Sequence, residues 1–310
     1  MKVFNDIQEI EGNVPNGSVI TLGNFDGIHI GHLSLIKRVK EVSKAKKLPS
    51  ILVTYFPNPA IVLGKKKNLK SIYTEEIKRE LIESFSLDML LTIPFTHEFS
   101  TMHAYEFTKN ILVDKLKPHH IIIGFNHFFG KDRQGDFAFL QSHAEEFDYS
   151  VEKIDQVYFN GEPVSSSNIR TYIQNGDIAK ANSVLTRPVM IRGKVVKGFQ
   201  RGRQIGFPTA NIQLAGESLI PPDGVYSVFV VINQKKYKAM LNIGKNPTFE
   251  NQDQSIEAHI FDFNEEIYGQ TIDCHFIDRI RDEIKFSGID ALKEQLQKDA
   301  IAAKQSLQSR

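Results

Sequence analysis

The hydrophobic pattern of this 310-residue chain changes near residue 187, and that change constrains the fold more than any other feature. Before it, short apolar runs alternate with longer stretches whose apolar residues recur at helical spacing. The predicted strands cover residues 18–23, 50–56, 88–95 and 119–125, and the predicted helices cover 32–47, 73–85 and 104–116. Strands that alternate with helices of this length predict βαβ units and a parallel, Rossmann-like α/β sheet.

After residue 187, glycine and proline become frequent and strand-like runs follow one another closely. These runs cover residues 190–198, 224–232, 236–244, 255–263 and 271–278. Such spacing is the signature of a small antiparallel barrel or sandwich. A final amphipathic segment at 288–307 predicts a C-terminal helix. The boundary is expected at about 184–188, which gives predicted domains of 1–185 and 186–310.

The charge balance limits the partners that the chain is expected to have. There are 38 Lys and Arg residues against 37 Asp and Glu residues. A protein that holds nucleic acid by bulk electrostatics usually carries a basic excess, so no nucleic-acid partner is predicted. The basic clusters at 44–47 and 65–67 are interpreted as solvated lysines.

The lone cysteine, Cys274, excludes a disulfide framework or a thiolate zinc site built from this chain. No apolar run approaches the about 18 residues of a membrane span. The N-terminal residues lack the long apolar region of a signal peptide. A soluble cytoplasmic protein without membrane contact is therefore predicted.

The stretch GNFDGIHIGH, residues 23–32, leads from a predicted strand into a predicted helix. His29 and His32 are three apart, so their side chains share one face of the first turn. Backbone amides and the helix dipole favour phosphate there, and Gly27 and Gly31 allow close approach of the backbone. Such a site can hold the α- and β-phosphates of ATP during adenylyl transfer. A helix start with incidental histidines is the alternative.

Three further motifs lie beside predicted strands or helices. FPNP at 56–59 has two prolines that fix a rigid loop, and GFNHFFGKDRQGD at 124–136 is rich in glycine, amide and charged side chains. Because ligands of parallel sheets bind at the carboxyl ends of strands, both loops are expected to share a crevice with residues 23–32. VSSSNIR at 164–170 places hydroxyls and an arginine at a helix start, which suits an anion, although an ordinary N-cap would use the same serines.

In this order and spacing, GNFDGIHIGH, FPNP, GFNHFFG and SSSNIR resemble the adenylyltransferase module of bacterial bifunctional riboflavin kinase/FAD synthetases, over nearly all of residues 18–185. The resemblance implies that His29 and His32 bind the ATP phosphates and that Asn24 and Arg170 assist at the nucleotide. It places Pro57 and Asn126 near the flavin. The other nucleotide-binding candidates are Gly23, Phe25, Gly31, Ser165, Ser166 and Ser167. The chain departs from the family in SSS for the common SST and in His127 for a frequent aromatic residue.

The stretch at 193–212 contains a second candidate site. Gly198, Gly202 and Gly206 recur at intervals of four, interleaved with Arg201 and Arg203. Such a loop can wrap phosphates through backbone amides and nearby cations, although it is not a Walker A sequence and a flexible hairpin would share its glycines.

Thr209, Asn211 and Glu257 add side chains suited to phosphoryl transfer. Thr209 and Asn211 are two apart, so they face the same side of an extended strand, and their oxygens are hard ligands that suit Mg²⁺. Glu257 lies in a strand-like run, where it is either exposed on the polar face or directed into a site. As a base it can accept a proton from a hydroxyl that attacks the γ-phosphate.

GFPTANI, PPDGVYSV (221–228), NIGKNPTF (242–249), EAHIFDF and IYG (267–269) together resemble the riboflavin kinase module of the same family, over essentially all of residues 188–295. The resemblance implies a six-stranded barrel with Thr209 and Asn211 at Mg·ATP and with Glu257 as the base on the ribityl 5′-hydroxyl. It places Arg281 near the flavin. The nucleotide-binding candidates here are Gly198, Arg203, Gly206, Pro208, Thr209 and Asn211.

These resemblances imply an enzyme with two activities. The barrel would phosphorylate riboflavin with ATP to give FMN, and the N-terminal module would transfer AMP from a second ATP to FMN, giving FAD and pyrophosphate. Two alternatives are a chain in which only the kinase module is active and a non-catalytic flavin-binding regulator. An aminoacyl-tRNA synthetase shares the letters HIGH but needs a KMSKS-like loop, for which SSSNIR is a poor substitute. The oligomeric state is not predicted.

Overall fold

The computed structural model describes residues 1–64, 69–198, 202, 205–245 and 254–308, with the backbone alone at 245 and 254. The chain divides into two compact units, Met1–Ser166 and Ser167–Arg310. Predicted site residue Arg203 and the lysines at 65–67 lie outside the described residues.

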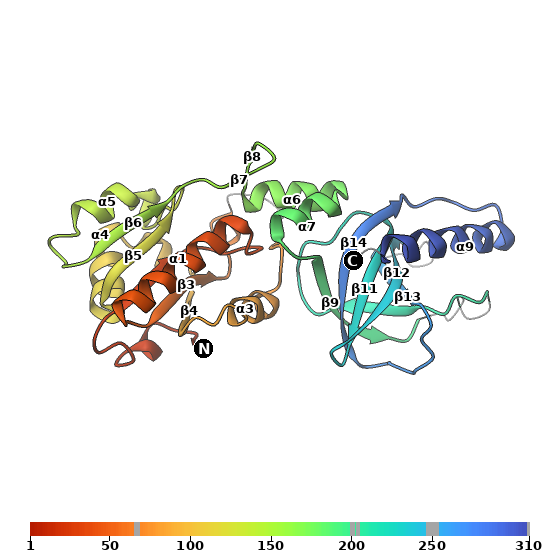
Figure 1. Ribbon diagram of the computed structural model, residues 1–310, viewed down its shortest axis with the longest axis horizontal. Helices are drawn as coiled ribbons and strands as arrows, with labels where there is room; N and C mark the ends of the chain where they lie inside the picture. The colour runs from red at the N-terminus through yellow and green to blue at the C-terminus, as the bar shows by residue number, and fades with distance from the viewer. Residues whose placement is uncertain (65–68, 199–201, 203–204, 246–253, 309–310) are drawn as a thin grey trace. The chain divides into compact units, whose positions relative to one another are not determined.

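The first unit is built on a parallel sheet with the strand order β1-β4-β3-β2-β5-β6 (Figure 1). The strands are β1 (Lys2–Phe4), β2 (Ser18–Leu22), β3 (Ser50–Phe56), β4 (Met89–Pro94), β5 (Pro118–Gly124) and β6 (Ser150–Ile154). From β2 the chain moves outward through β3 to β4, and it then returns to the other side of β2 with β5. The order therefore reverses between β2 and β5, which is where ligands of such sheets bind.

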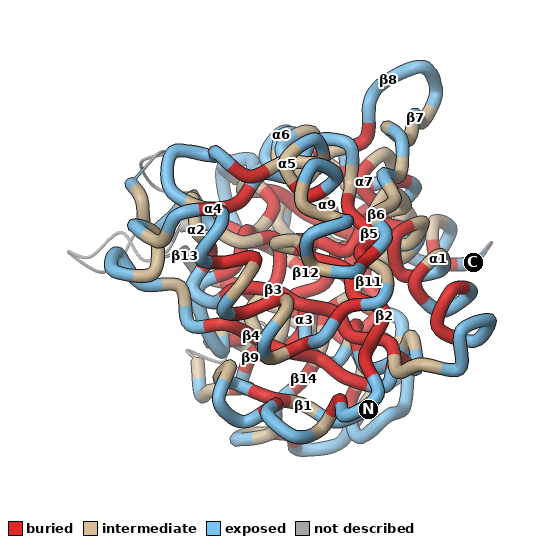
Figure 2. Tube along the Cα trace, turned by 90° about the vertical axis from the view of Figure 1, so that its left-hand side faces the viewer, coloured by how far each residue is buried: buried red, intermediate tan, exposed pale blue. Residues whose placement is uncertain are grey.

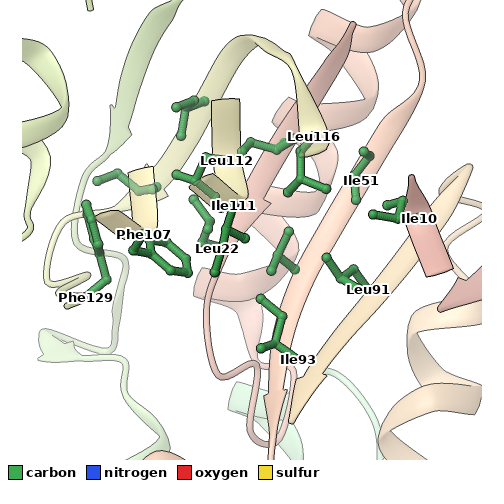
Figure 3. Close-up of a cluster of buried hydrophobic side chains, with 14 of the residues drawn as sticks. Ile10, Leu22, Ile51, Leu91, Ile93, Phe107, Ile111, Leu112, Leu116 and Phe129 are labelled. Atoms are coloured by element: carbon green, nitrogen blue, oxygen red, sulfur yellow. The ribbon is translucent and has the colours of Figure 1, made fainter. Parts of the chain in front are cut away.

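Helices cover the two faces of this sheet, as the alternating pattern predicts. They are α1 (Ile30–Lys46), α2 (Pro59–Val62), α3 (Glu75–Glu83), α4 (Ala104–Glu106) and α5 (Phe137–Ser142), with the short turns η1 (Gln8–Ile10), η2 (Phe99–Thr101) and η4 (Lys131–Arg133) and the π-helix η3 (Phe107–Leu116). Leu22 of β2 packs in the cluster that includes Phe107 and Leu112 (Figure 3). Ile20 belongs to the same cluster, whereas Val19 packs in the cluster that includes residues of α1. The central strands β2, β3 and β4 are almost entirely buried, whereas the edge strand β6 has no fully buried residue (Figure 2).

In the described part of the second unit, six antiparallel strands close into a barrel, so the barrel is confirmed and the sandwich is excluded. They are β9 (Val189–Val196), β10 (Ala210–Leu214), β11 (Gly224–Ile232), β12 (Lys235–Lys245), β13 (Gln254–Ile260) and β14 (Thr271–Arg281), in the spatial order β10-β13-β12-β11-β14-β9. The thiol of Cys274 on β14 is fully buried, and burial raises its pKa.

Three helices accompany these strands: α6 (Ser166–Asn175), α7 (Ile178–Leu185) and α9 (Ile289–Ser306). The side chain of Asn182 on α7 donates to Phe276 O at 2.9 Å and accepts from Val189 N at 2.7 Å. The predicted C-terminal helix α9 packs Ala303 against an outer face of the barrel that includes Phe229. A short hairpin, β7 (Tyr158–Phe159) with β8 (Glu162–Pro163), ends the first unit.

Candidate active sites

The loop that follows β2 forms the first candidate site, beside the point where the strand order reverses. His29 is the N-cap residue of α1, and its Nδ1 accepts a hydrogen bond from His32 N at 3.4 Å. Because Nδ1 accepts, the neutral ring carries its proton on Nε2, which is therefore a donor. The two imidazole rings stack with 3.7 Å between centroids and 15° between planes. The two histidines thus form one unit at the helix start.

Two residues of this loop, Phe25 and Ile28, have left-handed backbones, with φ of 48° and 46°. Both side chains are fully buried, and this conformation costs a residue other than glycine on the order of 1–3 kcal/mol. Three hydrogen bonds fasten the loop: Thr54 Oγ1 donates to Asn24 O at 3.2 Å, Ile72 N to Asp26 Oδ1 at 2.9 Å, and Ser166 Oγ to Asp26 O at 2.9 Å. The loop shape is therefore imposed by its surroundings.

Two glycines near the histidines leave room for neighbouring aromatic rings. A Cβ at Gly31 would lie 3.2 Å from Nδ1 and Cε1 of His29, and a Cβ at Gly23 would lie 3.0 Å from the Phe25 ring. Both distances are tighter than ordinary van der Waals contact. Of the predicted serines, Ser165 and Ser166 belong to this unit. Ser167 and Arg170 belong to the second unit, and their part in nucleotide binding stays a prediction.

The loops after β3 and β5 bring apolar and polar groups to the same edge of the sheet. Pro57, in a cis peptide bond with Phe56, and Asn126 are both exposed. Phe56, Phe125 and Phe128 are exposed to between 42% and 49%, which is unusual for so apolar a side chain. The sequence reasoning missed these rings, although the aromatic residues in GFNHFF gave a signal. They offer flat apolar surfaces at the ligand-binding edge.

His127 differs from its exposed neighbours because its ring turns inward. Nε2 is buried without a hydrogen-bond partner, and the ring stacks on Phe129 with 6.0 Å between centroids. Burial lowers the pKa of His127 to about 4. The ring is therefore neutral near pH 7 and occupies the place of an apolar side chain.

The second candidate site lies on the outer face of the barrel. Glu257 is paired across β13 with Asn211 on β10 and with Asn242 on β12, so the three side chains share a face. Ile256 and Ala258, which flank Glu257, are buried on the opposite face. Thr209 Oγ1 donates to Glu257 Oε2 at 3.0 Å. The predicted Thr209, Asn211 and Glu257 are thus brought together.

The glycine-rich segment approaches this row of polar groups. A Cβ at Gly198 would overlap the Asn211 side chain, and a Cβ at Gly202 would overlap Phe207 O. Gly206 has a φ of 84°, which favours glycine. Pro208 O accepts a hydrogen bond from His259 Nδ1 at 2.8 Å. Gly198 therefore packs against the predicted ligand Asn211, and Gly202 packs against the backbone of Phe207.

Arg281 is held by the C-terminal helix. Its guanidinium makes a paired contact with the carboxylate of Asp299, in which Nε lies 2.9 Å from Oδ1 and Nη2 lies 2.7 Å from Oδ2. Asp299 is only 1% exposed, so this pair ties the end of β14 to α9. A role of Arg281 near the flavin stays a prediction.

Two polar residues, one beside Glu257 and one beside Gly244 of the neighbouring strand, were missed. Asn242 is its cross-strand neighbour, and the carboxylate of Glu283 occupies the space that a Cβ at Gly244 would need. No local pattern shows either placement, because that of Asn242 depends on the register of β12 with β13 and that of Glu283 on how the segment after β14 meets β12.

Each half of the chain matches the model of a known protein family. A family model described as FAD synthetase matches residues 12–168, and one described as riboflavin kinase matches residues 185–307. A bifunctional riboflavin kinase/FMN adenylyltransferase of Bacillus subtilis is 38% identical over 91% of this chain and 90% of the relative. The protein of that name from Escherichia coli K12 is 31% identical over 98% of this chain and 97% of the relative. The chain belongs to this bifunctional family.

Membership confirms the resemblance that the motifs in both halves predict. A crystal structure from Streptococcus pneumoniae titled as a macrolide-efflux protein is also similar, with 33% identity, a TM-score of 0.88 and coverage of 97% of this chain and 98% of that one. Among the residues that the structure describes, no helix has the length and apolar character needed to cross a bilayer.

Proposed function

We propose that the two candidate sites carry the two activities for which the family is named. The barrel transfers the γ-phosphoryl group of ATP to riboflavin, which gives FMN. The first unit transfers the adenylyl group of a second ATP to FMN, which gives FAD and pyrophosphate. The assignment rests on the observation that each family match contains one group of candidate site residues. The FAD synthetase match, 12–168, contains the stacked histidine pair. The riboflavin kinase match, 185–307, contains Thr209, Asn211 and Glu257.

At the first site, the histidine pair and the start of α1 bind the phosphates of ATP. His29 keeps its Nε2 proton because Nδ1 is occupied by His32 N, so it donates to an oxygen that gains charge as pyrophosphate leaves. The backbone amides of the first turn of α1 add fixed partial positive charge. An FMN phosphate oxygen attacks the α-phosphorus, and positioning with charge stabilisation accounts for the catalysis.

At the second site, Glu257 is the base that accepts the proton of the riboflavin 5′-hydroxyl. The residues fit Mg²⁺ for two reasons. The Thr209 hydroxyl donates its hydrogen bond to Glu257, so its oxygen lone pairs are available to a cation. The Asn211 side chain lies beside Glu257. Thr209 and Asn211 would hold the ion, which would neutralise phosphate charge. The backbone amides of the described glycines Gly198 and Gly202 would add donors for the phosphates.

The functional modules are proposed to span 1–185 and 186–310. Support comes from the family matches, which end at 168 and begin at 185, so the proposed boundary coincides with the start of the second match. The intervening α7, and α6 from Ser167 onward, belong to the second compact unit. A cytoplasmic location and the absence of nucleic-acid and membrane partners stay predictions.

One assay tests both activities. The purified chain is given Mg·ATP with riboflavin in one tube and with FMN in another, and the products are separated over time. FMN followed by FAD in the first tube, with FAD in the second, supports both sites. FMN that accumulates without FAD would leave only the kinase active, and no product in either tube would favour a flavin-binding regulator.

The glycine after the cap gives a first prediction. Gly31→Ala places a methyl group 3.2 Å from the His29 ring, which must move by a few tenths of an ångström. We expect FAD formation from FMN to fall by about 10-fold, because misplacement of a positioned group by about 1 Å can cost about 100-fold. FMN formation by the same protein is the control, and an unchanged FAD rate would contradict the assigned role of the His29 ring.

The inward ring of His127 gives a second prediction. Its pKa is about 4 in the folded chain and 6.5 ordinarily, so the unfolded chain binds a proton at His127 over this range and the folded chain does not. Stability is therefore lost as the pH falls from about 6.5 to about 4. His127→Phe should remove this loss, by more than about 1 kcal/mol at pH 4.

Thermal unfolding at several pH values between 4 and 7 checks this second prediction. The variant should melt at least as high as the parent at pH 7, because a buried polar atom without a partner is removed. Equal pH dependence in the two proteins would show that His127 does not stay neutral in the folded state.

A further inference from the structure

Lys78 on α3 is a buried ammonium group that neither reaction step uses. It is 7% exposed, and lysine is rarely so buried without partners. Its Nζ lies 2.7 Å from Glu75 Oε2, 3.4 Å from Thr54 Oγ1 and 3.4 Å from Tyr55 O. An ammonium has three N–H donors, and these three acceptors match them. All three donors of the Lys78 ammonium are therefore matched by acceptors of the protein itself.

The contact with Thr54 connects Lys78 to the first site. Thr54 is fully buried on β3, and its hydroxyl donates a hydrogen bond to Asn24 O. Its oxygen therefore accepts from Lys78, which makes a relay from Lys78 through Thr54 to Asn24. Asn24 directly precedes Phe25, the first of the two left-handed residues in the loop. The relay holds the backbone at the point where it enters that conformation.

The segment that carries Lys78 also holds the loop at a second point. Ile72 N donates to Asp26 Oδ1, and Asp26 is 5% exposed. Desolvation raises the pKa of Glu75 and the Asp26 charge raises it further, whereas Lys78 and Arg79 lower it. Burial thus raises the pKa of Glu75 overall, and the Lys78 ammonium, whose Nζ lies 2.7 Å from Glu75 Oε2, opposes that rise.

We propose that Lys78 is a positioning residue for adenylyl transfer, which acts through Thr54 to hold residues 24–28 in the conformation that sets His29 and His32 at the start of α1. This inference rests on the adenylyl transfer proposed for the first site. Without the relay, the left-handed residues relax toward commoner conformations and the histidine cap shifts. Because the three donors of Lys78 Nζ face protein acceptors, we expect the effect to fall on the rate of the bound complex rather than on substrate affinity.

Two variants test the inference from different directions. Lys78→Met removes the ammonium, and Thr54→Val removes only the hydroxyl while it keeps the Lys78–Glu75 pair. We expect kcat for FAD formation from FMN to fall by about 10- to 100-fold in each, since small misplacements near a reacting centre have effects of this size. The KM for FMN and for ATP should change by less than about 3-fold.

The double variant should be no slower than the slower single variant, because both changes interrupt one relay and coupled sites are not additive. Lys40→Met is the matched control. Lys40 also lies on a helix and donates to a backbone carbonyl, Phe85 O at 2.6 Å, but it is exposed. Its FAD formation should equal that of the parent, and FMN formation should be unchanged in every variant.

Unchanged kcat in Thr54→Val would overturn the inference, as would multiplied effects in the double variant or a rise in KM without a fall in kcat. All assays run well below the melting temperature of each variant. If Lys78→Met does not fold, the kcat of Thr54→Val for FAD formation alone tests the inference. A parent protein that makes no FAD would refute the proposed function instead.

Discussion

Glu257→Gln should lower FMN formation by about 10²–10⁴-fold, the usual contribution of a general base. Glutamine keeps the size of the side chain and an oxygen that can accept from Thr209 Oγ1, which donates to Glu257 at 3.0 Å. The row of Asn242, Glu257 and Asn211 should therefore stay in register. What is lost is the carboxylate that takes the proton of the attacking hydroxyl. The rate of FMN formation under saturating Mg·ATP measures the effect.

The same preparation supplies an internal control, because FAD formation from added FMN uses the other unit and should be unchanged. Glu265→Gln is a matched substitution of an exposed carboxylate in the second unit and should leave both rates near those of the parent. If Glu257→Gln reduced the two activities together, the assignment of one reaction to each unit would be wrong.

His32→Ala should lower FAD formation by about 10²–10³-fold, the usual loss for one donor that stabilises developing charge. The ring of His32 stacks on that of His29 at 3.7 Å and packs against Phe25 at 5.0 Å. Alanine removes the ring but keeps the backbone N–H that His29 accepts, so the helix cap is retained. The loss should therefore reflect chemistry more than unfolding.

Single-turnover formation of FAD from FMN measures this loss, and FMN formation from riboflavin serves as the control. A His32→Ala protein that makes FAD at the parent rate would remove the histidine pair from the catalytic machinery. The first unit would then need another source of positive charge for the phosphates.

Segments with strong local patterns were predicted well. The runs at 50–56 and 224–232 coincide with β3 and β11, because continuous apolar and β-branched residues suit buried strands. β6 was missed, since its residues Ser150–Ile154 carry charges and Glu152 meets its partners Arg38 and His120 only in the folded unit. The π-helix η3 was predicted as an ordinary helix because the residue pattern does not distinguish the two hydrogen-bond spacings.

Site residues that follow from a local pattern were predicted, and those that depend on long-range contacts were not. The histidine pair follows from spacing on one turn, and Thr209 with Asn211 follows from alternation on a strand. The register that places Glu257 between Asn211 and Asn242 depends on closure of the barrel. Lys78 lies in the helix predicted at 73–85, but nothing in that pattern distinguishes it from an exposed lysine, and its burial depends on contacts with Thr54 and Tyr55 of β3. Long-range contacts of this kind leave no local pattern.

The buried thiol of Cys274 has a practical consequence for labelling experiments. It is the one cysteine of the chain, its side chain is fully buried, and burial keeps it protonated. Maleimides and other thiol-directed dyes need an accessible thiolate. A cysteine introduced at an exposed position such as Glu265 should therefore react selectively in the parent background, so that fluorescent probes can be attached to the native protein without first replacing Cys274.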